Sequence, residues 1–411
     1  MEYLGHSADY GIQVEGAKAD FAAVIKRSRG VADKMSKGIQ FLMKKNKIDV
    51  INGFGKLNAK KDVEVTGADG KVTSHQAKHV ILATGARARQ LPNLPIDGKM
   101  IIGYREAMNL PAQPKSMIVV GSGAIGVEFA YFYHTLGTKV TIVEFMPKIV
   151  PVEDDDISRE LERLFRKKGM TVMTNASVEK VEKNGEGVKA TVKTAEGMTT
   201  LEADVVLSAV GIASNIENIG LETLGVKTDK GKVLVDKYYK TNVSNVYAIG
   251  DIVPGQALAH VAMKEAIICV EAIANKEGKF GHVPEPLDYN NVPGCTYCSP
   301  EVASVGMTEK QAKEAGYEIK VGKFPFSASG KASAAGATEG FVKVVFDAKY
   351  GEWLGTHMIG ANVTEIIVET VVARKLETTW HEILDSIHPH PTMSEHVKDA
   401  IEVALGEAIH L

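Results

Sequence analysis

The sequence has few cysteines, no long apolar run and no strong excess of charge of either sign. Three cysteines among 411 residues cannot build a disulfide framework, and an odd count is typical of a reducing compartment, so we expect a cytoplasmic protein. No stretch approaches the roughly 20 apolar residues that a membrane-spanning helix needs. The net charge of −3 lacks the strongly basic character of nucleic-acid-binding proteins. Small molecules or proteins are therefore the expected partners.

The hydrophobic pattern predicts several domains, since a domain typically has about 100 to 200 residues. Apolar residues at helical spacing predict a long amphipathic helix over 21–42. Short β-like runs follow, separated by glycine and aspartate turns, at 48–52, 63–66 and 79–82. Prolines over 92–95 and 111–114 indicate crossings between domains.

A strand–turn–helix–strand pattern begins near residue 115. The strands are expected at 117–120 and 139–144 and the helix at 127–136. A further helix at 157–168 and strands ending at Val210 predict a parallel sheet with helical crossovers. From about residue 286, antiparallel-looking strands precede three helices, which is α+β order.

The turn of this unit reads Gly121-Ser-Gly123-Ala-Ile-Gly126, a dinucleotide-binding pattern in the right context. Gly121 permits the tight turn, Gly123 lets backbone N–H groups approach a pyrophosphate, and Gly126 lets helix and strand pack closely. The N-terminus of the helix then favours the negative charge through its dipole and free donors.

Glu144 ends the second strand 18 positions after Gly126, near the separation of about 20 residues expected for an acid that binds ribose hydroxyls. A carboxylate accepts hydrogen bonds from a 2′-hydroxyl and repels a 2′-phosphate, so NAD is predicted rather than NADP. The alternative is a glycine turn followed by a surface glutamate.

Three further segments resemble one family across almost the whole chain. They are His79-Val-Ile-Leu-Ala-Thr-Gly85, the run from Thr241 to Asp251 (TNVSNVYAIGD), and His388-Pro-His-Pro-Thr-Met-Ser-Glu395. These segments are similar to the A-T-G turn, the second FAD signature and the H-x-H-P-T…E signature of the flavin-linked pyridine-nucleotide disulfide oxidoreductases. The resemblance implies FAD and NAD as cofactors.

The resemblance also assigns cofactor-binding residues. For FAD they are Gly55, Thr84, Gly85, Gly250, Asp251, Ala259 and His260; for NAD they are Glu128, Val178 and Gly211, besides Gly121, Gly123, Gly126 and Glu144. Asp251 would bind the ribityl hydroxyls, although it could instead cap the following segment. A plain turn at Gly55 and a solvated helix residue at Glu128 are the alternatives there. Around Gly211 the chain lacks the arginine and proline that the family usually has, which leaves that contact with NAD less well supported. No metal site is predicted.

In the C-terminal signature the resemblance makes His390 the acid–base and Glu395 the residue that orients it. A dithiol attacks a disulfide as its thiolate, so a histidine suits the proton transfer. Thr392-x-x-Glu395 is also a capping box for the helix that follows, and both roles could coexist. A catalytic part for His388 is less well supported, and this residue could serve only to support the loop.

The family's first G-x-G-x-x-G and its C-x4-C redox pair do not occur in these 411 residues. We therefore expect that the chain lacks the N-terminal FAD and redox-disulfide segment and that it is inactive alone. Cys295-Thr-Tyr-Cys298 is no substitute, because residues three apart in a strand point to opposite faces. Cys269 is expected in a helical core.

The predicted fold class is α/β, with two Rossmann-like domains, of which the FAD-binding one is incomplete, and a C-terminal α+β dimerisation domain. The predicted domains are a first FAD-binding part at 1–114, an NAD-binding domain at 115–235, a second FAD-binding part at 236–285 and a dimerisation domain at 286–411.

The resemblance implies an FAD-dependent enzyme that reoxidises protein-bound dihydrolipoamide with NAD. It also implies a homodimer, in which each His390 serves the partner's disulfide, and a lipoyl-bearing partner protein of a 2-oxo acid dehydrogenase or glycine-cleavage complex. The alternatives are another NADH-linked flavin disulfide reductase, or a non-catalytic NAD-binding dimeric paralogue.

Overall fold

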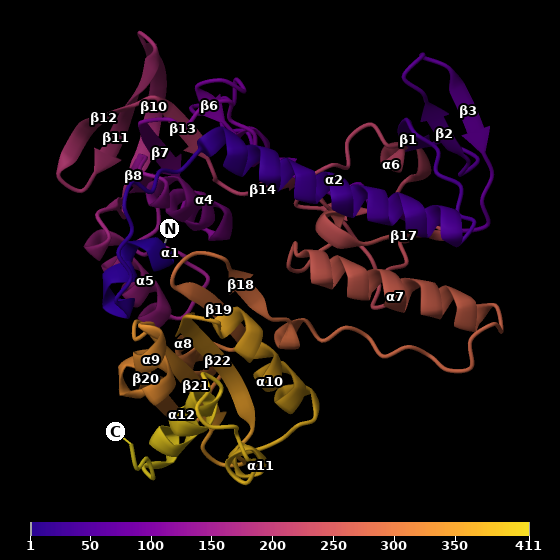
Figure 1. Ribbon diagram of the computed structural model, residues 1–411. Helices are drawn as coiled ribbons and strands as arrows, with labels where there is room; N and C mark the ends of the chain where they lie inside the picture. The colour runs from indigo at the N-terminus through magenta and orange to yellow at the C-terminus, as the bar shows by residue number, and fades with distance from the viewer. Residues whose placement is uncertain (1, 411) are drawn as a thin grey trace. The chain divides into compact units, whose positions relative to one another are not determined.

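The computed structural model describes residues 2–410. Their contacts divide the chain into two compact units (Figure 1). Unit 1 comprises residues 1–25, 90–211 and 290–411, and unit 2 comprises residues 26–89 and 212–289. Within the described residues, no helix is both long and apolar enough to cross a membrane.

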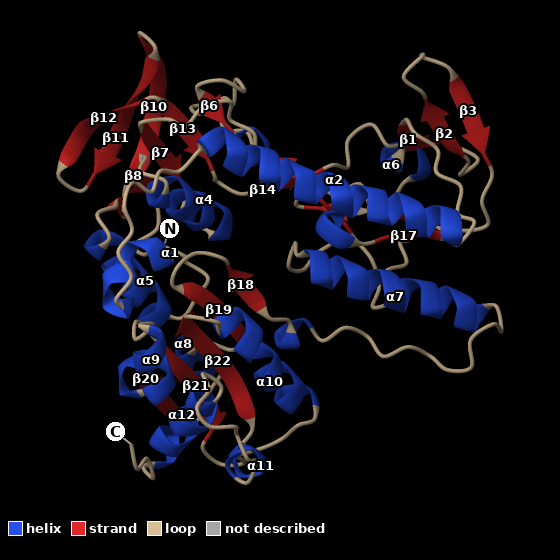
Figure 2. Cartoon of the chain, in the orientation of Figure 1, coloured by secondary structure: helices blue, strands red, loops and turns tan. Residues whose placement is uncertain are grey.

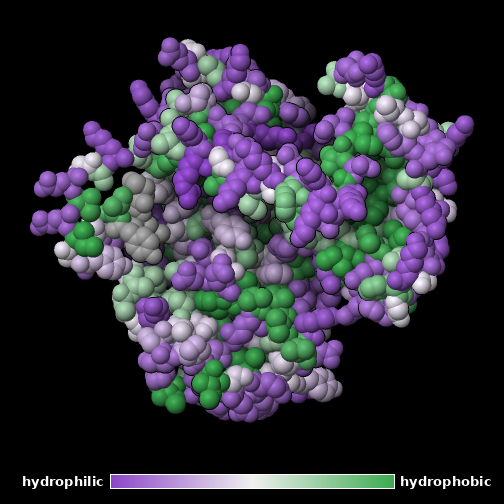
Figure 3. Space-filling view, turned by 45° about the vertical axis from the view of Figure 1, so that its right-hand side comes forward, coloured by the Kyte–Doolittle hydropathy of each residue, from purple (hydrophilic) through white to green (hydrophobic). Residues whose placement is uncertain are grey.

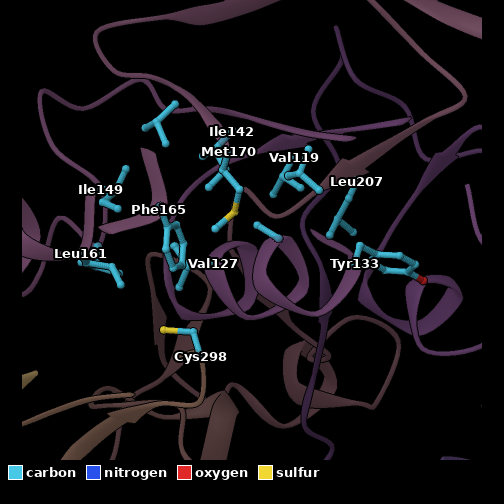
Figure 4. Packing of buried hydrophobic residues seen from close by; sticks show 14 of the residues in the cluster. Val119, Val127, Tyr133, Ile142, Ile149, Leu161, Phe165, Met170, Leu207 and Cys298 are labelled. Carbon is cyan, nitrogen blue, oxygen red and sulfur yellow. The ribbon is translucent and has the colours of Figure 1, made fainter. Parts of the chain in front are cut away.

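The first half of unit 1 is a five-stranded parallel sheet flanked by helices, as the hydrophobic pattern predicted. Its strand order is β6–β13–β7–β8–β9. The strands are β6 (Ile101–Ile102), β7 (Ser116–Val120), β8 (Lys139–Val143), β9 (Thr171–Met173) and β13 (Val205–Ser208), and the helices are α3 (Tyr104–Ala107), α4 (Ala124–Thr135) and α5 (Asp155–Lys167). Apolar side chains of α4 and α5 pack on the sheet (Figure 4).

The prediction of parallel strands throughout this region is wrong for the segment between β9 and β13. Here β10 (Ser177–Asn184), β11 (Gly187–Thr194) and β12 (Gly197–Ala203) form a separate antiparallel sheet. Short turns join these strands, so no helical crossover is present to make them parallel.

The second half of unit 1 has the predicted α+β order. An antiparallel sheet of order β18–β19–β22–β21–β20 packs against helices (Figure 2). Its members are β18 (Gly294–Thr296), β19 (Glu301–Gly306), β20 (Ile319–Pro325), β21 (Phe341–Asp347) and β22 (Trp353–Gly360), with α8 (Glu309–Glu314), α9 (Gly330–Ala335), α10 (Val363–Lys375), α11 (Trp380–Leu384) and α12 (Glu395–Leu405).

Both halves of unit 1 share one core. Cys298, Val302, Phe341 and Ile359 belong to the same hydrophobic cluster as residues of the parallel sheet. In Figure 4 the Cys298 side chain lies beneath α4. This common core explains why the contacts join the parallel-sheet and antiparallel-sheet halves in one unit.

Unit 2 consists of small sheets and two long helices. The helices are α2 (Phe21–Lys45) and α7 (Ala259–Lys276). The first five residues of α2 belong to unit 1, and the rest of that helix belongs to unit 2. The strands are β1 (Phe54–Leu57), β2 (Val63–Thr66), β3 (Val72–His75), β4 (Val80–Leu82), β5 (Ala86–Ala88), β14 (Ile212–Ser214), β15 (Thr228–Asp229), β16 (Lys232–Val233) and β17 (Val246–Ala248), with a short helix α6 (Leu221–Leu224). Strand β4 pairs in parallel with β17, and β5 pairs antiparallel with β14.

The helix predicted over 21–42 is confirmed as α2, but the strand predicted at 48–52 is wrong. Residues 48–52 form no strand, and the first strand of unit 2 is β1. Val50 and Ile51 are exposed, and among the described residues no neighbouring strand forms backbone hydrogen bonds with this segment.

The bounds of the four predicted domain segments stay predictions, with two observations against their details. Strand β6 lies in the parallel sheet of the glycine turn, although residues 101–102 were expected in the FAD-binding part. Residues 212–235 group with unit 2, although they were expected in the NAD-binding domain.

Candidate active site

The glycine turn lies at the carboxyl end of β7, where ligands bind in open parallel sheets. Gly121 has a φ of +95°, and a Cβ there would lie 2.5 Å from the carbonyl oxygen of Ala209. A Cβ at Gly126 would overlap the Gly121 carbonyl, whereas nothing lies within 4 Å of one at Gly123. No side chain caps the N-terminus of α4, so its first N–H groups can bind an anion.

Glu144 follows β8 at the same edge of the sheet. Its carboxylate is buried, with 6% exposure, and accepts hydrogen bonds from Ser122 N at 2.7 Å, Ser122 Oγ at 2.6 Å and Met146 N at 2.7 Å. A carboxylate has about four acceptor positions, so one remains for a ribose hydroxyl. The three bonds fix the carboxylate beside the glycine turn.

The other predicted NAD residues are spread over unit 1. Glu128, in α4, accepts a hydrogen bond from Tyr297 N at 2.8 Å, and burial raises the pKa of its carboxyl group while that bond opposes the shift. Val178 is buried in a hydrophobic cluster, with its carbonyl bonded to Asn93 Nδ2. Gly211 follows β13 with a φ of +104°. Their roles stay predictions.

The predicted FAD residues all lie in unit 2. Because β4 and β17 are parallel neighbours, Thr84 and Gly85 follow the same edge as Gly250 and Asp251. Thr84 Oγ1 donates to the Asn215 carbonyl at 2.6 Å, and Asn215 Nδ2 donates to the Thr84 carbonyl at 3.0 Å. Two loop segments far apart in the sequence are thereby joined.

Asp251 presents an available acceptor. Its backbone carbonyl accepts from Ser214 Oγ and Lys232 Nζ, at 2.7 and 2.6 Å, but no donor within residues 2–410 contacts its carboxylate. The side chain caps neither the short helical turn at Gly250–Ile252 nor α7. The capping alternative therefore lacks support, while a carboxylate free to accept suits a polyol.

Two other predicted FAD residues have less distinctive surroundings. Gly55 lies within β1, paired with Val65, so it is not in a plain turn. The position that requires glycine is Gly53, where φ is +155° and a Cβ would lie 2.5 Å from the Thr66 carbonyl oxygen. Ala259 and His260 begin α7, and no side chain caps that helix.

His390 and Glu395 are in contact at the start of α12. His390 Nδ1 lies 2.9 Å from Glu395 Oε1, and Thr392 N donates to Glu395 Oε2 at 2.7 Å. Burial raises the pKa of Glu395, but these two hydrogen bonds outweigh it and hold the pKa below its usual range. An ionised carboxylate only accepts, so Nδ1 carries a proton, and in the neutral ring Nε2 is then the acceptor. The His390 side chain is 79% exposed.

The predicted capping box is half formed. Glu395 accepts from Thr392 N, but Thr392 Oγ1 donates to the Pro389 carbonyl at 2.8 Å instead of capping α12. The N-cap residue of α12 is Ser394, which makes no side-chain capping bond. Glu395 thus contacts the histidine and the backbone together.

The three cysteines are all free thiols in separate surroundings. Burial raises the pKa of Cys269 to about 12, of Cys295 to about 11 and of Cys298 to about 12. Cys295 packs against the core of the antiparallel sheet and Cys298 against that of the parallel sheet. Thiols with raised pKa values are poor nucleophiles. Among residues 2–410 no metal-binding cluster occurs either.

Sequence reasoning missed the residues that hold these groups in place. Ser122 orients Glu144, Glu369 bonds to His388, and Glu265 bonds to Gly250 N. Only Ser122 carries a local signal, as a polar residue inside the glycine turn. The two glutamates lie on helices whose contacts depend on tertiary packing.

The chain matches two adjacent parts of one known family. Residues 6–266 match the pyridine nucleotide-disulphide oxidoreductases, and residues 292–401 match the dimerisation domain of the same family. Dihydrolipoyl dehydrogenase of Rhizobium etli is 48% identical over 100% of this chain and 88% of its own length. That of Zymomonas mobilis is 46% identical over 98% of this chain and 85% of its own length.

Solved structures agree with these matches. The crystal structure of LpdA from Mycobacterium tuberculosis superposes with a TM-score of 0.88 at 28% identity, covering 98% of this chain and 86% of that chain. The flavoprotein disulfide reductase RclA from Escherichia coli gives a TM-score of 0.82 at 25% identity, covering 98% and 88%. The chain therefore belongs to the pyridine nucleotide-disulphide oxidoreductases.

Proposed function

We propose that this chain acts in the dihydrolipoyl dehydrogenase reaction, the oxidation of a dihydrolipoyl dithiol with NAD⁺ as acceptor. Relatives of that name are 39 to 48% identical over nearly the whole chain. The observation that carries the proposal is the His390–Glu395 pair, with an exposed imidazole whose Nε2 has no partner within residues 2–410. Such a nitrogen can take a proton from a thiol.

The cofactors of the family are FAD and NAD, and the residues present fit both. The uncapped start of α4 and the oriented Glu144 suit a pyrophosphate and a ribose. In unit 2, the turn at Gly250 suits the ribityl chain, as does the Asp251 carboxylate, which has no donor among the residues that the structure describes. A flavin held by these residues would supply the two-electron chemistry that links dithiol oxidation to the reduction of NAD⁺.

The protein's own contribution is proton control and alignment. Glu395 holds Nδ1 of His390 protonated, so Nε2 faces outward as the acceptor. Protonation of Nε2 would make the ring a cation, which the adjacent carboxylate stabilises, much as the acid of a hydrolase triad does. The buried Glu144 places a negative charge where NADP would carry its 2′-phosphate, and this disfavours NADP.

The dithiol-exchange step is not assigned to any cysteine of these 411 residues. The family's C-x4-C pair does not occur in them, and burial raises the pKa of each of the three thiols that do. The proposal therefore assigns the proton transfer to His390 and the nucleotide binding to unit 1.

The match to a dimerisation domain supports a homodimer. We propose further that the substrate is a lipoyl group carried on a partner protein of a 2-oxo acid dehydrogenase or glycine-cleavage complex. Free thiols are typical of reducing compartments, which favours a cytoplasmic location.

The test reduces flavin with pyridine nucleotide, a step that needs no redox disulfide. The purified chain is loaded with FAD, and its absorption is followed after addition of NADH or NADPH. We expect rapid bleaching with NADH and much slower bleaching with NADPH. Glu144→Ala should slow the NADH reaction at low NADH by about tenfold, since a charge-assisted hydrogen bond is lost. Wild-type flavin that NADH does not reduce would contradict the proposal.

A further inference from the structure

We propose that Glu265 is the residue that positions the FAD-binding turn of unit 2, acting through the backbone N–H of Gly250 and with Tyr289 as its support. This inference rests on the proposed use of FAD. Glu265 lies in α7 and was not singled out by any motif. The residue is 1% exposed, so the contacts of its carboxylate must satisfy it within the protein.

The first contact fixes the turn itself. Gly250 N donates to Glu265 Oε2 at 2.6 Å, at a residue whose φ of +72° favours glycine. The bond also brings the turn onto α7, where a Cβ at Gly250 would lie 3.3 Å from Ala262 Cβ. The next residue is Asp251, so the bond fixes the Ile249–Gly250 peptide directly before the residue whose carboxylate would bind the ribityl chain.

The second contact fixes the glutamate. The Tyr289 hydroxyl donates to Glu265 Oε1 at 2.5 Å, and the Tyr239 hydroxyl lies 3.3 Å from that of Tyr289. With both carboxylate oxygens engaged, the side chain has one orientation. Burial raises the pKa of Glu265, whereas the bonds from Tyr289 and Gly250 oppose the shift.

Tyr289 also contacts the loop that follows the turn. A Cβ at Gly255, where φ is +127°, would lie 2.5 Å from Tyr289 Cε1, and Gln256 Nε2 donates to the Tyr289 carbonyl at 3.1 Å. The loop between the turn and α7 is thus held at Gly250 by Glu265 and at Gly255 by Tyr289. Such duplicated support is typical of residues that preorganise a binding site.

Glu265 is therefore a positioning residue that does not itself touch the cofactor. Each oxygen of its carboxylate accepts one hydrogen bond from the protein, while the neighbouring Asp251 carboxylate has no donor within residues 2–410. The two acids therefore have different roles. Glu265 holds the backbone of the turn, and Asp251 presents its carboxylate to the ribityl hydroxyls.

The test titrates the FAD-free 411-residue chain with FAD, following flavin fluorescence and the visible spectrum. Glu265→Ala should raise the Kd for FAD by about tenfold or more, since a charge-assisted hydrogen bond is lost. Glu265→Gln should stay within about threefold of wild type, because its amide oxygen can still accept from Gly250 N. Glu271→Ala, a half-exposed position of α7, is the matched control and should leave the Kd unchanged.

A merely structural role would lower the unfolding temperature of Glu265→Ala and leave the Kd and the flavin spectrum of the folded protein unchanged. That result would overturn the inference and leave the proposed function standing.

If Glu265→Ala does not fold, Tyr289→Phe keeps the ring packing and removes the donor to Glu265. It should raise the Kd about threefold and shift the flavin absorption, and a wild-type Kd and spectrum would overturn the inference. A wild-type chain that binds no FAD would overturn both the inference and the proposed function.

Discussion

His388 and His390 are two residues apart, and each contacts a glutamate, but they differ in exposure and in the nitrogen they use. His388 has 9% side-chain exposure, and its Nε2 lies 2.8 Å from Glu369 Oε1 of α10. His390 has 79% exposure and uses Nδ1 for Glu395. Nε2 of His388 is therefore bonded to Glu369, whereas Nε2 of His390 is available to a substrate.

The difference teaches that the pairing of a histidine with a carboxylate is not by itself a sign of catalysis. At His388 the pair links the loop before α12 to α10, across 19 residues of sequence. At His390 the pair is local and leaves a basic nitrogen at the surface. Val368 and Val372 of α10 and Leu376, its C-cap residue, are exposed. This region of unit 1 therefore presents both hydrophobic and polar groups, as does the face of the molecule in Figure 3.

The largest effect should come from His390→Ala. Loss of the proton acceptor should slow dihydrolipoamide-driven NADH formation by about 100-fold or more, the usual contribution of general acid–base catalysis. This assay and the rate assays below use the 411 residues joined to a segment that carries the family's C-x4-C pair, since these residues contain no such pair. Because the side chain is exposed, the free energy of unfolding should change by less than about 0.5 kcal/mol. NADH formation at 340 nm and urea unfolding measure the two effects. An unchanged rate would remove His390 from the mechanism.

His388→Ala should show the opposite pattern. It removes a buried ring and its bond to Glu369, so we expect the free energy of unfolding to fall by about 2 kcal/mol. The rate should fall less than in His390→Ala, and each variant is the control for the other. If urea unfolding gave equal stabilities for the two variants, the structural role of His388 would be refuted.

Glu395→Gln should have an intermediate effect on the rate. The amide can accept from His390 Nδ1 or from Thr392 N, but not from both, and it cannot stabilise a cationic ring as a carboxylate does. We expect about a tenfold lower kcat with little change in the Kd for FAD. A kcat equal to that of wild type would show that Glu395 serves only the backbone at the start of α12.

The sequence was informative where a contact is local. The β7 strand, glycine turn, α4 and β8 follow from a short hydrophobic pattern, and His390 meets Glu395 five residues away. The sequence was uninformative where partners are distant, because Glu369 and Glu265 look like ordinary helix residues until the chain is folded. The antiparallel β10–β12 sheet was missed for a similar reason: an apolar strand pattern does not specify the direction of its neighbour.

The smallest effect concerns pH. The hydrogen bond to Glu369 raises the pKa of His388 above its usual value, although burial opposes the shift. A histidine whose folded-state pKa is raised contributes stability below its unfolded pKa of about 6.5, and that stability is lost as the pH rises through the folded-state value. Glu369→Gln should therefore destabilise the protein by about 1 kcal/mol at low pH and by much less at high pH.

Urea unfolding of wild type and Glu369→Gln at about pH 5.5 and about pH 9, on either side of the usual histidine pKa, measures this difference. Glu365→Gln, on the same helix, is the matched control. Since His390 contacts Glu395 and not Glu369, the substitution should leave the pH dependence of NADH formation unchanged. A shift of that pH profile would mean that the two histidines titrate together, and the division into a structural and a proton-transferring pair would fail.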